Sequence, residues 1–299
     1  MIEAIRRLIR DCGLSRFETD LMSLLLPSIR MKTERAKDES IAVGESRIGG
    51  LPELPDGAAW PYWKGAPLAF LAQIRLADLV DSGEKTALPS TGQLLFFYDP
   101  HQSAGGFDPA DAGSGKALYF NATRHLKRLT PPPTLPKGGR FESCRVQFGF
   151  QWTLPPADSL YTDRLGIRWE RGGDPFSPGR STPERDAYYD LLDRVDELYK
   201  ASPPYHQIAG HPRPVQNEMQ LECQLASHGI YCGDGTGFRD PRRAELEKGA
   251  MDWRLLLQID TDDKPGMEWG DMGMVYFWIK QQQLEKYQFD EVWTIFQCG

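Results

Sequence analysis

The densest group of possible metal ligands lies between residues 206 and 232. It contains three histidines and two cysteines, all of them zinc-ligand types: His206, His211, Cys223, His228 and Cys232. The first two histidines are five residues apart, not four as in a helical H-E-x-x-H pair, and the cysteines are nine apart. We expect loop histidines and buried thiols, with no metal and no cofactor, while a Cys–His nucleophilic pair stays open.

Carboxylates form a second group between two expected strands, and its members are Asp260, Asp262, Asp263, Glu268 and Asp271. A calcium loop requires D-x-[DN]-x-[DN]-G with a glutamate at its twelfth position, and this run does not fit. A solvated acidic loop is therefore expected. Asp271, which closely precedes Gly273, either caps the turn or faces a cleft.

Motifs of common catalytic folds are missing from the sequence. No G-x-S-x-G nucleophile motif occurs. The glycine-rich stretches GGDPFSPG (172–179), GSGK (113–116) and GDGTG (233–237) match neither a P-loop nor a dinucleotide-binding turn. These absences favour a protein that is not an enzyme, without deciding the matter.

Composition and charge limit the class of protein further. With 40% hydrophobic and 26% charged residues, the 299-residue chain is expected to form a single compact domain over 1–299. A net charge of −7 argues against nucleic-acid binding. No apolar run reaches the ~20 residues of a membrane span, and the N-terminus lacks the apolar core of a secretory signal. Five scattered cysteines without a C-x-x-C motif indicate a cytoplasmic protein.

Helices are expected near the start and in the middle of the chain. Apolar periodicity predicts an N-terminal helical segment over 1–26, split near Gly13, and a long helix from Pro183 to Ser202. We expect these helices to cover one face of a sheet. The stretch from Gly44 to Pro67 is too rich in Gly and Pro for regular structure, but its tryptophans indicate an ordered loop.

Two apolar strands carry a Gln-Ile pair, LAFLAQIRL around Gln73 and WRLLLQID around Gln258. Alternation places Leu68, Phe70, Ala72, Ile74 and Leu76 on one face of the first strand. Each strand is followed by a glycine and an aromatic strand, GQLLFFYD from Gly92 or GMVYFWIK from Gly273, in which Leu94, Phe96 and Phe97 match Val275, Phe277 and Trp278. This order predicts an α+β, strand-rich single body with peripheral helices and two pseudo-repeated β units, about 46–99 and 251–299.

Two roles remain open for Gln73 and Gln258. A buried carboxamide needs hydrogen-bond partners, and most such groups bond to backbone or water. Each glutamine would then hold a neighbouring Gly/Pro-rich loop. Alternatively, both face a shared cleft and contact the polar edge of a ligand.

Several longer motifs resemble the YwqG-like family of bacterial proteins. They are SRIGGLPELPDGAAWPYWKGAPLAFLAQIRL, LPSTGQLLFFYD, HQIAGHPRPVQ and WGDMGMVYFWIKQQQLEKYQFDEVW, within about 46–99 and 206–293. The resemblance implies a cytoplasmic bacterial protein with a strand-rich α+β fold. It implies no activity, since the family's function is unknown, although the position of some members near toxin loci suggests an inhibitor role.

We expect a non-catalytic cytoplasmic binding protein with an unknown protein or small molecule as its partner. The expected surface combines aromatic and arginine side chains, which favour recognition sites, with the two glutamines: Arg47, Trp60, Trp63, Gln73, Gln258, Trp269 and Asp271. The alternative is an enzyme acting on a small polar substrate in a cleft between the two repeats. Convergent polar groups and shifted carboxylate pKa values in a cleft would favour the enzyme.

Overall fold

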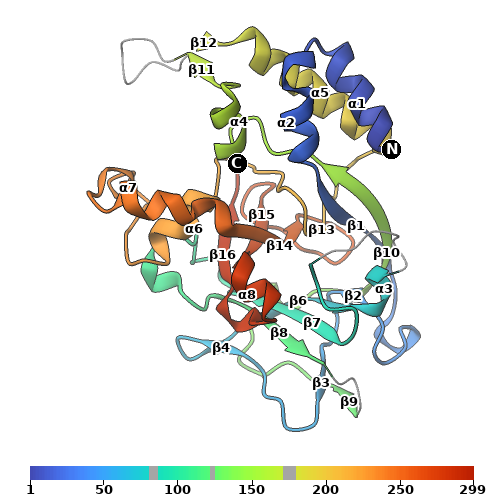
Figure 1. Cartoon of the computed structure of the whole chain (residues 1–299). Coiled ribbons are helices and arrows are strands. Elements are labelled where there is room, and N and C mark those ends of the chain that lie inside the picture. Colours follow the sequence, from blue (N-terminus) through green and yellow to red (C-terminus); the bar gives the residue numbers. More distant parts are fainter. Residues whose placement is uncertain (81–86, 122–124, 171–179) are drawn as a thin grey trace.

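A ten-stranded antiparallel sheet forms the body of the protein (Figure 1). The computed structural model describes residues 1–80, 87–121, 125–170 and 180–299. In their order across the sheet, the strands are β16 (Trp293–Gln297), β15 (Met274–Lys280), β14 (Trp253–Asp260), β13 (Gln207–Ile208), β1 (Leu26–Arg35), β10 (Cys144–Thr153), β2 (Arg47–Ile48), β6 (Ala69–Arg75), β7 (Gln93–Tyr98) and β8 (Gly115–Phe120).

Shorter elements surround this sheet. Three two-stranded ribbons pair β3 (Glu53–Pro55) with β9 (Leu126–Arg128), β4 (Tyr62–Trp63) with β5 (Ala66–Pro67), and β11 (Trp169–Glu170) with β12 (Arg180–Ser181). The α-helices are α1 (Ile2–Asp11), α2 (Glu18–Ser23), α3 (Ala77–Val80), α4 (Leu160–Leu165), α5 (Pro183–Tyr199), α6 (Gln220–Ala226), α7 (Arg243–Leu246) and α8 (Gln281–Glu285). The 3₁₀ helices are η1 (Ser15–Phe17), η2 (Asp38–Ser40), η3 (Pro109–Asp111), η4 (Lys137–Gly139), η5 (Gly237–Arg239), η6 (Glu247–Asp252) and η7 (Phe289–Glu291). None of the described helices is long and apolar enough to cross a membrane.

The strand order is symmetric about the central β1–β10 pair. On one side of this pair lie β13, β14, β15 and β16, and on the other side β2, β6, β7 and β8. The pairings have equivalent registers: Arg47 of β2 lies opposite Gln73 of β6, and Gln207 of β13 lies opposite Gln258 of β14. Two pseudo-repeated β units therefore build the sheet. The second unit begins earlier in the chain than residue 251, because β13 belongs to it.

A β-bulge recurs at the same position in both units. The register of β6 against β7 shifts between Phe70 and Ala72, and that of β14 against β15 shifts between Leu255 and Leu257. Each bulge lies just before its glutamine. Simple alternation predicts that Phe70 and Ala72 share a face. The extra residue in the bulge breaks this alternation, so the two side chains point to different faces. Phe70 instead belongs to a different apolar cluster from Ala72.

The sheet curls until its two edges are adjacent. The Phe296 N–H donates to the Gly105 carbonyl at 3.1 Å, and the Trp293 indole donates to the Gly106 carbonyl at 2.8 Å, which links β16 to the segment before β8. The inner faces of both units share one core, where the equivalent rings of Phe96 and Phe277 meet edge to face at 5.2 Å between centroids. Each unit has a second apolar cluster on its outer face.

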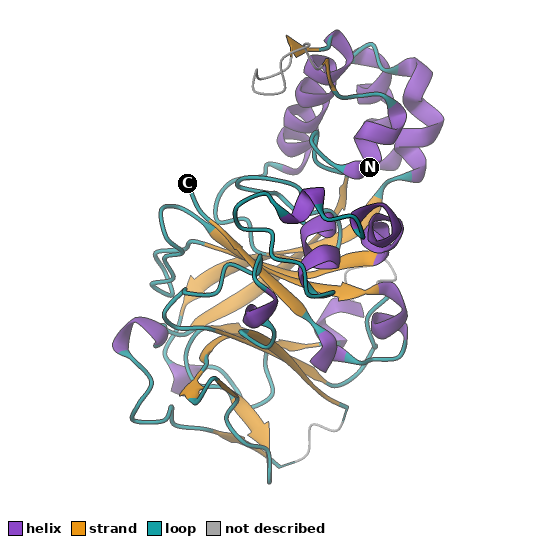
Figure 2. Ribbon diagram, turned by 90° about the vertical axis from the view of Figure 1, so that its left-hand side faces the viewer, coloured by secondary structure: helices purple, strands orange, loops and turns teal. Residues whose placement is uncertain are grey.

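Helices α1, α2, α4 and α5 form a lobe with its own core, which we call the helical lobe (Figures 1 and 2). Ile5 and Ile9 of α1 pack with Tyr188 and Leu191 of α5, and Thr182 caps the N-terminus of α5 with its hydroxyl. The lobe lies at the end of the long β1–β10 ribbon. The expectation that these helices cover a face of the sheet is therefore wrong, because they bury their apolar sides against each other.

Candidate functional site

The two glutamines hold equivalent loops, residues 45–53 (the first loop) and 205–213 (the second loop). Gln73 accepts the Glu53 N–H at 2.9 Å and donates to the Glu45 carbonyl at 3.0 Å. Gln258 accepts the Arg213 N–H at 2.9 Å and donates to the carbonyl of residue 205 at 2.7 Å. Each carboxamide thus joins the two ends of its loop. This is the structural one of the two roles that the sequence left open for these glutamines.

A glycine at the same point of each loop allows the chain to pass close to the central strands. Gly50 and Gly210 have φ of +73° and +77°. A Cβ at Gly50 would lie 2.7 Å from the Ser143 Cβ of the segment before β10, and one at Gly210 would lie 2.5 Å from the Ser28 Cβ of β1. Both left-handed geometry and close approach exclude larger residues. The two loops are therefore built in the same way.

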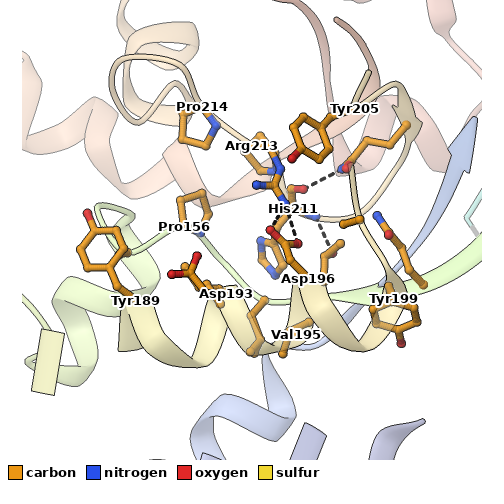
Figure 3. A pocket seen from close by; sticks show the side chains of 18 of the residues that line it. Pro156, Tyr189, Asp193, Val195, Asp196, Tyr199, Tyr205, His211, Arg213 and Pro214 are labelled. Atoms are coloured by element: carbon orange, nitrogen blue, oxygen red, sulfur yellow. Dashed lines mark hydrogen bonds and ion pairs between the residues drawn. The ribbon is translucent and has the colours of Figure 1, made fainter. Parts of the chain in front are cut away.

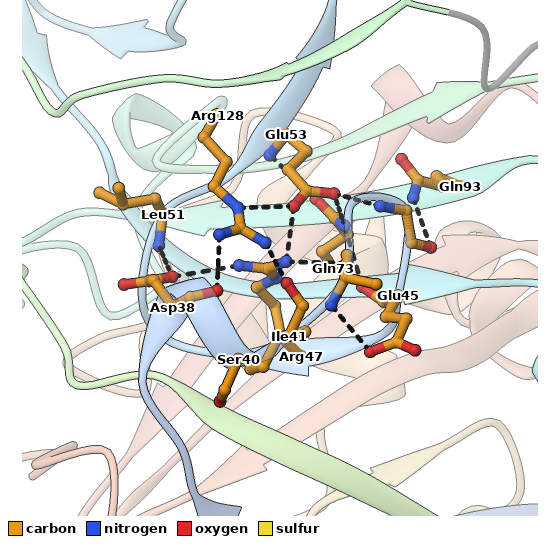
Figure 4. Close-up of polar contacts among 12 residues, drawn as sticks. Asp38, Ser40, Ile41, Glu45, Arg47, Leu51, Glu53, Gln73, Gln93 and Arg128 are labelled. Carbon is orange, nitrogen blue, oxygen red and sulfur yellow. Dashed lines mark hydrogen bonds and ion pairs between the residues drawn. The ribbon is translucent and has the colours of Figure 1, made fainter.

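The first loop is closed by a buried charge cluster (Figure 4). Glu53 is fully buried, and its carboxylate accepts from Arg47 at 2.6 Å, from Arg128 of β9 at 3.0 Å and from Gln73 at 3.0 Å. Arg47 also pairs with Asp38 at 3.1 Å. Burial lowers the pKa of Arg47, while Glu53 opposes that shift. The guanidinium of Arg128, which also donates to two backbone carbonyls, fills the space over this loop.

The residues expected to form one recognition surface are dispersed or enclosed. Four of the seven residues are buried: Arg47, Gln73, Gln258 and Trp269. The first three hold the two loops, and Trp269 packs in the core against Tyr98 and Phe141. A surface made by all seven residues together is therefore not formed.

Three of the seven lie nearer to solvent. Trp60 and Trp63 are partly buried, and their indole N–H groups donate to the carbonyls of Leu68 and Ala112 at 2.9 and 3.0 Å. Asp271 is exposed at a hairpin end, where its carbonyl accepts the N–H of Gly299 at 2.9 Å. The two tryptophans thus fasten the loop that contains them.

A pocket of about 410 Å³ lies beside the second loop (Figure 3). Its position is equivalent to that of the charge cluster beside the first loop. Its walls come from the end of β10, from α5 and from the second loop with the residues after it. Arg213 takes the place that Glu53 has in the first loop, so the charge is reversed. Its guanidinium binds both oxygens of Asp196 on α5, yet its side chain stays 40% exposed. The second unit therefore keeps an open pocket of ligand size.

Two arginines flank one tyrosine ring in this pocket. The guanidinium of Arg213 lies 4.1 Å from the Tyr205 ring centroid, and that of Arg30 lies 5.7 Å from it. Arg30 is buried, and its Nη2 donates to the carbonyl of Ser202. Within the described residues, Nε and Nη1 of Arg30 have no hydrogen-bond partner. Burial lowers the pKa of Arg30, with repulsion from Arg213 adding to the shift and Asp196 opposing it.

Titratable groups on the other walls are shifted as well. Burial raises the pKa of Glu218 to about 7, although its carboxylate accepts the N–H groups of Gln220 and Leu221 at the start of α6. Burial lowers the pKa of His211 to about 4, and its Nε2–H donates to the Leu24 carbonyl at 2.7 Å. His211 is therefore neutral near pH 7, while Glu218 changes charge in that range.

The histidines and cysteines considered for zinc have other partners. His206 accepts the Asp260 N–H at its Nδ1 and lies 3.1 Å from Asp262 through Nε2. All five cysteines are free, and burial raises the pKa of both Cys223 and Cys232, the latter to about 11. Such thiols are protonated and weakly nucleophilic. In the part of the chain that the structure describes, no three His, Cys, Asp or Glu side chains are grouped closely enough to hold a metal ion.

Sequence reasoning missed the pocket residues Arg30, Tyr205 and Arg213. Arg30 lies on a strand 175 residues before Tyr205, so only the fold brings them together. One signal was available: aligning SRIGGLPEL with HQIAGHPRP places Glu53 opposite Arg213. The glycine-rich stretch 172–179 lies outside the described residues.

Fold and site together define a strand-rich protein of two equivalent β units, one sealed and the other open to a pocket under a helical lobe. Residues 46–298 match the family model described as a domain of unknown function, DUF1963, and the chain belongs to that family. The match begins after α1, α2 and β1. Among curated proteins, none matches the chain.

Proposed function

We propose that this protein is a non-catalytic binding protein that takes a small molecule into the pocket between the helical lobe and the second loop. The observation that carries the proposal is Arg30, a buried guanidinium that lines a pocket of about 410 Å³ and has two nitrogens without a hydrogen-bond partner among the residues that the structure describes. A buried charged group that lacks partners is costly, and a ligand with acceptor groups would relieve that cost.

The comparison between the two loops supports the same proposal. In the first loop, Arg128 comes from another part of the chain and completes the cluster around Glu53. In the second loop, Asp196 reaches Arg213, but the space beside them remains open. Because one of two equivalent loops is filled by the protein itself, the other is suited to be filled by a ligand. Five free cysteines and the YwqG-like motifs support our proposal that the protein acts in the bacterial cytoplasm.

A second candidate function is an enzyme that acts on a small polar substrate in the same pocket. The observation favouring it is Glu218, whose pKa of about 7 suits a general acid or base. Its carboxylate also caps α6, which is a structural role. Replacing Glu218 with Gln would abolish turnover of an identified ligand if this candidate is correct, and would leave the ligand bound but unchanged if the protein only binds.

The test is a thermal-shift screen against a metabolite collection, with two matched variants. Gln151→Trp places a large ring at the pocket wall on β10, whereas Gln147→Trp places the same ring on the same face of β10, outside the pocket. We expect at least one compound to raise the melting temperature of the wild type and of Gln147→Trp, but not of Gln151→Trp.

Two results would count against small-molecule binding. The first is that every active compound stabilises Gln151→Trp as strongly as the wild type, which would place binding elsewhere. The second is that no compound acts, while affinity capture recovers one protein partner whose binding survives Gln151→Trp. That outcome would favour the inhibitor role suggested by the family resemblance.

A further inference from the structure

The charges at one end of the pocket do not balance. The guanidinium groups of Arg30 and Arg213 both lie close to the Tyr205 ring, and among the described residues Asp196 is the carboxylate that pairs with Arg213. In the described part of the chain, Arg30 has a single backbone carbonyl as its hydrogen-bond partner. Two guanidinium groups thus face one carboxylate, and because Arg30 is buried, its attraction for an anion is stronger than that of an arginine at the surface.

The equivalent arginine of the other β unit provides a comparison. Arg30 of β1 pairs with Gln207 of β13, and Arg145 of β10 pairs with Arg47 of β2, so Arg30 and Arg145 occupy equivalent positions. Both donate to a serine carbonyl, that of Ser202 or Ser40. Arg145 is exposed to water, whereas Arg30 is more than nine-tenths buried under the helical lobe. Burial without a counter-charge therefore distinguishes Arg30, and the strand position alone does not explain it.

The rest of the pocket is aromatic and apolar near this end. Trp152, Tyr199, Leu192 and Pro212 line it together with the ring of Tyr205 (Figure 3). Other carboxylates line the pocket as well: Asp193 lies on α5, one turn before Asp196, and Asp158 and Glu218 come from other segments. A ligand with an oxyanion at one end and an apolar body would meet the arginines with its charge and the rings with its body.

We propose that the ligand is a small organic anion whose carboxylate or phosphate group is attracted by Arg30 and Arg213, with its apolar body against the aromatic side chains of the pocket. This inference rests on the proposed function and specifies the chemical class of its ligand. On binding, the guanidinium groups of Arg30 and Arg213 would attract the anion in charge-assisted pairs, for which a guanidinium is well suited.

The experiment is a calorimetric titration of the full chain with matched probes. The panel contains aromatic and aliphatic carboxylates, the neutral amide of each acid, the corresponding phosphate monoesters, and inorganic phosphate alone. The variants are Arg30→Gln, Arg213→Gln and, as the matched control, the pseudo-equivalent Arg145→Gln. Arg30→Lys retains the charge without the planar fork, and circular dichroism verifies that each variant is folded.

We expect carboxylates or phosphate esters to bind at least about tenfold tighter than the neutral amides, which corresponds to about 1.4 kcal/mol. That preference should disappear in Arg30→Gln and in Arg213→Gln, weaken in Arg30→Lys and persist in Arg145→Gln. If only the esters and inorganic phosphate bind, phosphate is the group recognised; if only the acids bind, carboxylate is.

Two outcomes would overturn the inference. If the neutral amides bind as tightly as the acids and this binding is lost in Gln151→Trp, the pocket is a ligand site but not one for anions, and the proposed function stands alone. If anions bind equally well to Arg30→Gln, Arg213→Gln and the wild type, the arginines do not hold them. A panel in which no compound of any charge binds would count against the proposed function as well.

Discussion

Gln73 and Gln258 connect the ends of their loops through side-chain hydrogen bonds inside the protein. Replacing Gln258 with Leu leaves the Arg213 N–H and the Tyr205 carbonyl without their partner. Replacing Gln73 with Leu does the same to the Glu53 N–H and the Glu45 carbonyl. At about 1–3 kcal/mol per unsatisfied buried group, we expect each variant to lose about 2–4 kcal/mol of unfolding free energy, measured by urea denaturation.

The exposed Gln147 of β10 provides the control for these two variants, and Gln147→Leu should change stability by less than about 0.5 kcal/mol. If Gln73→Leu and Gln258→Leu were as stable as that control, water or neighbouring side chains would be replacing the carboxamides. The two loops would then have equivalent shapes, but their glutamines would not contribute to the free energy of unfolding.

Glu218 makes stability depend on pH in a defined direction. Its pKa is about 7 in the folded protein and 4.5 in an unperturbed carboxyl group, so the folded state binds more protons between these values. The unfolding free energy therefore falls as pH rises from about 4.5 to 7 and stays lower above pH 7. Glu218→Gln cannot ionise and keeps an acceptor for α6. We expect it to be about 1–2 kcal/mol more stable than the wild type at pH 8, and little different at pH 4.5.

Urea denaturation at both pH values measures this difference. The exposed Glu245 serves as the comparison, since Glu245→Gln removes a carboxylate that lies at the surface. Equal pH profiles for Glu218→Gln and the wild type would show that Glu218 keeps an ordinary pKa, and would also remove the observation that favours an enzyme.

At the scale of elements, the β3–β9 ribbon is fastened by Arg128, whose guanidinium meets the fully buried Glu53. Arg128→Ala removes one of two cationic partners from a buried carboxylate, which we expect to cost about 3 kcal/mol. The neighbouring Lys127 pairs with Asp56 at the surface, where an ion pair contributes ~0.2–1 kcal/mol. Lys127→Ala should therefore be nearly neutral.

Hydrogen exchange read by mass spectrometry locates this effect. Peptides from β3 and β9 should exchange faster in Arg128→Ala, while those from β14 and β15 keep their protection, because Glu53 bonds with Arg47, Gln73 and Arg128, which lie outside the second unit. Equal loss of protection in both units would mean that the cluster stabilises the whole sheet rather than the ribbon.

The sequence predicts the long elements well and the short ones poorly. Pattern and order identified the paired strands of both units and the helix from Pro183, which ends at Tyr199. The bulges before Gln73 and Gln258 were missed, since an extra residue breaks the alternation on which the prediction depends. Strands β2 and β13 have two residues each, too few for periodicity, yet they carry the loops that form the site.

The pocket residues could not be predicted for a related reason. Arg30 and Tyr205 meet only because β1 pairs with β13, a contact between segments far apart in the chain. Asp196 reaches Arg213 only because α5 belongs to a lobe placed over the second loop. Positions of this kind follow from topology, which local patterns do not specify.

At the scale of the whole molecule, the protein has two main apolar cores that share few residues of the chain. One lies inside the curled sheet, and the other lies in the helical lobe. The pocket lies between the helical lobe and the second loop, with α5 on one side. Relative motion of the two parts would change the pocket first, and the Arg213–Asp196 ion pair spans that junction.

This division predicts separate responses to damage in the lobe. Ile9 is fully buried in the lobe core, and Ile9→Ala should lower local stability by about 2–5 kcal/mol through lost apolar contact and an unfilled cavity. Peptides from α1, α2 and α5 should then exchange faster, while β7 and β15 remain protected, because their core is the sheet interior. Ile2→Ala, on the same helix but 38% exposed, is the control and should leave all peptides unchanged. A uniform loss of protection across both cores in Ile9→Ala would instead show one cooperative unit, and ligand binding at the junction would then act on the stability of the entire protein.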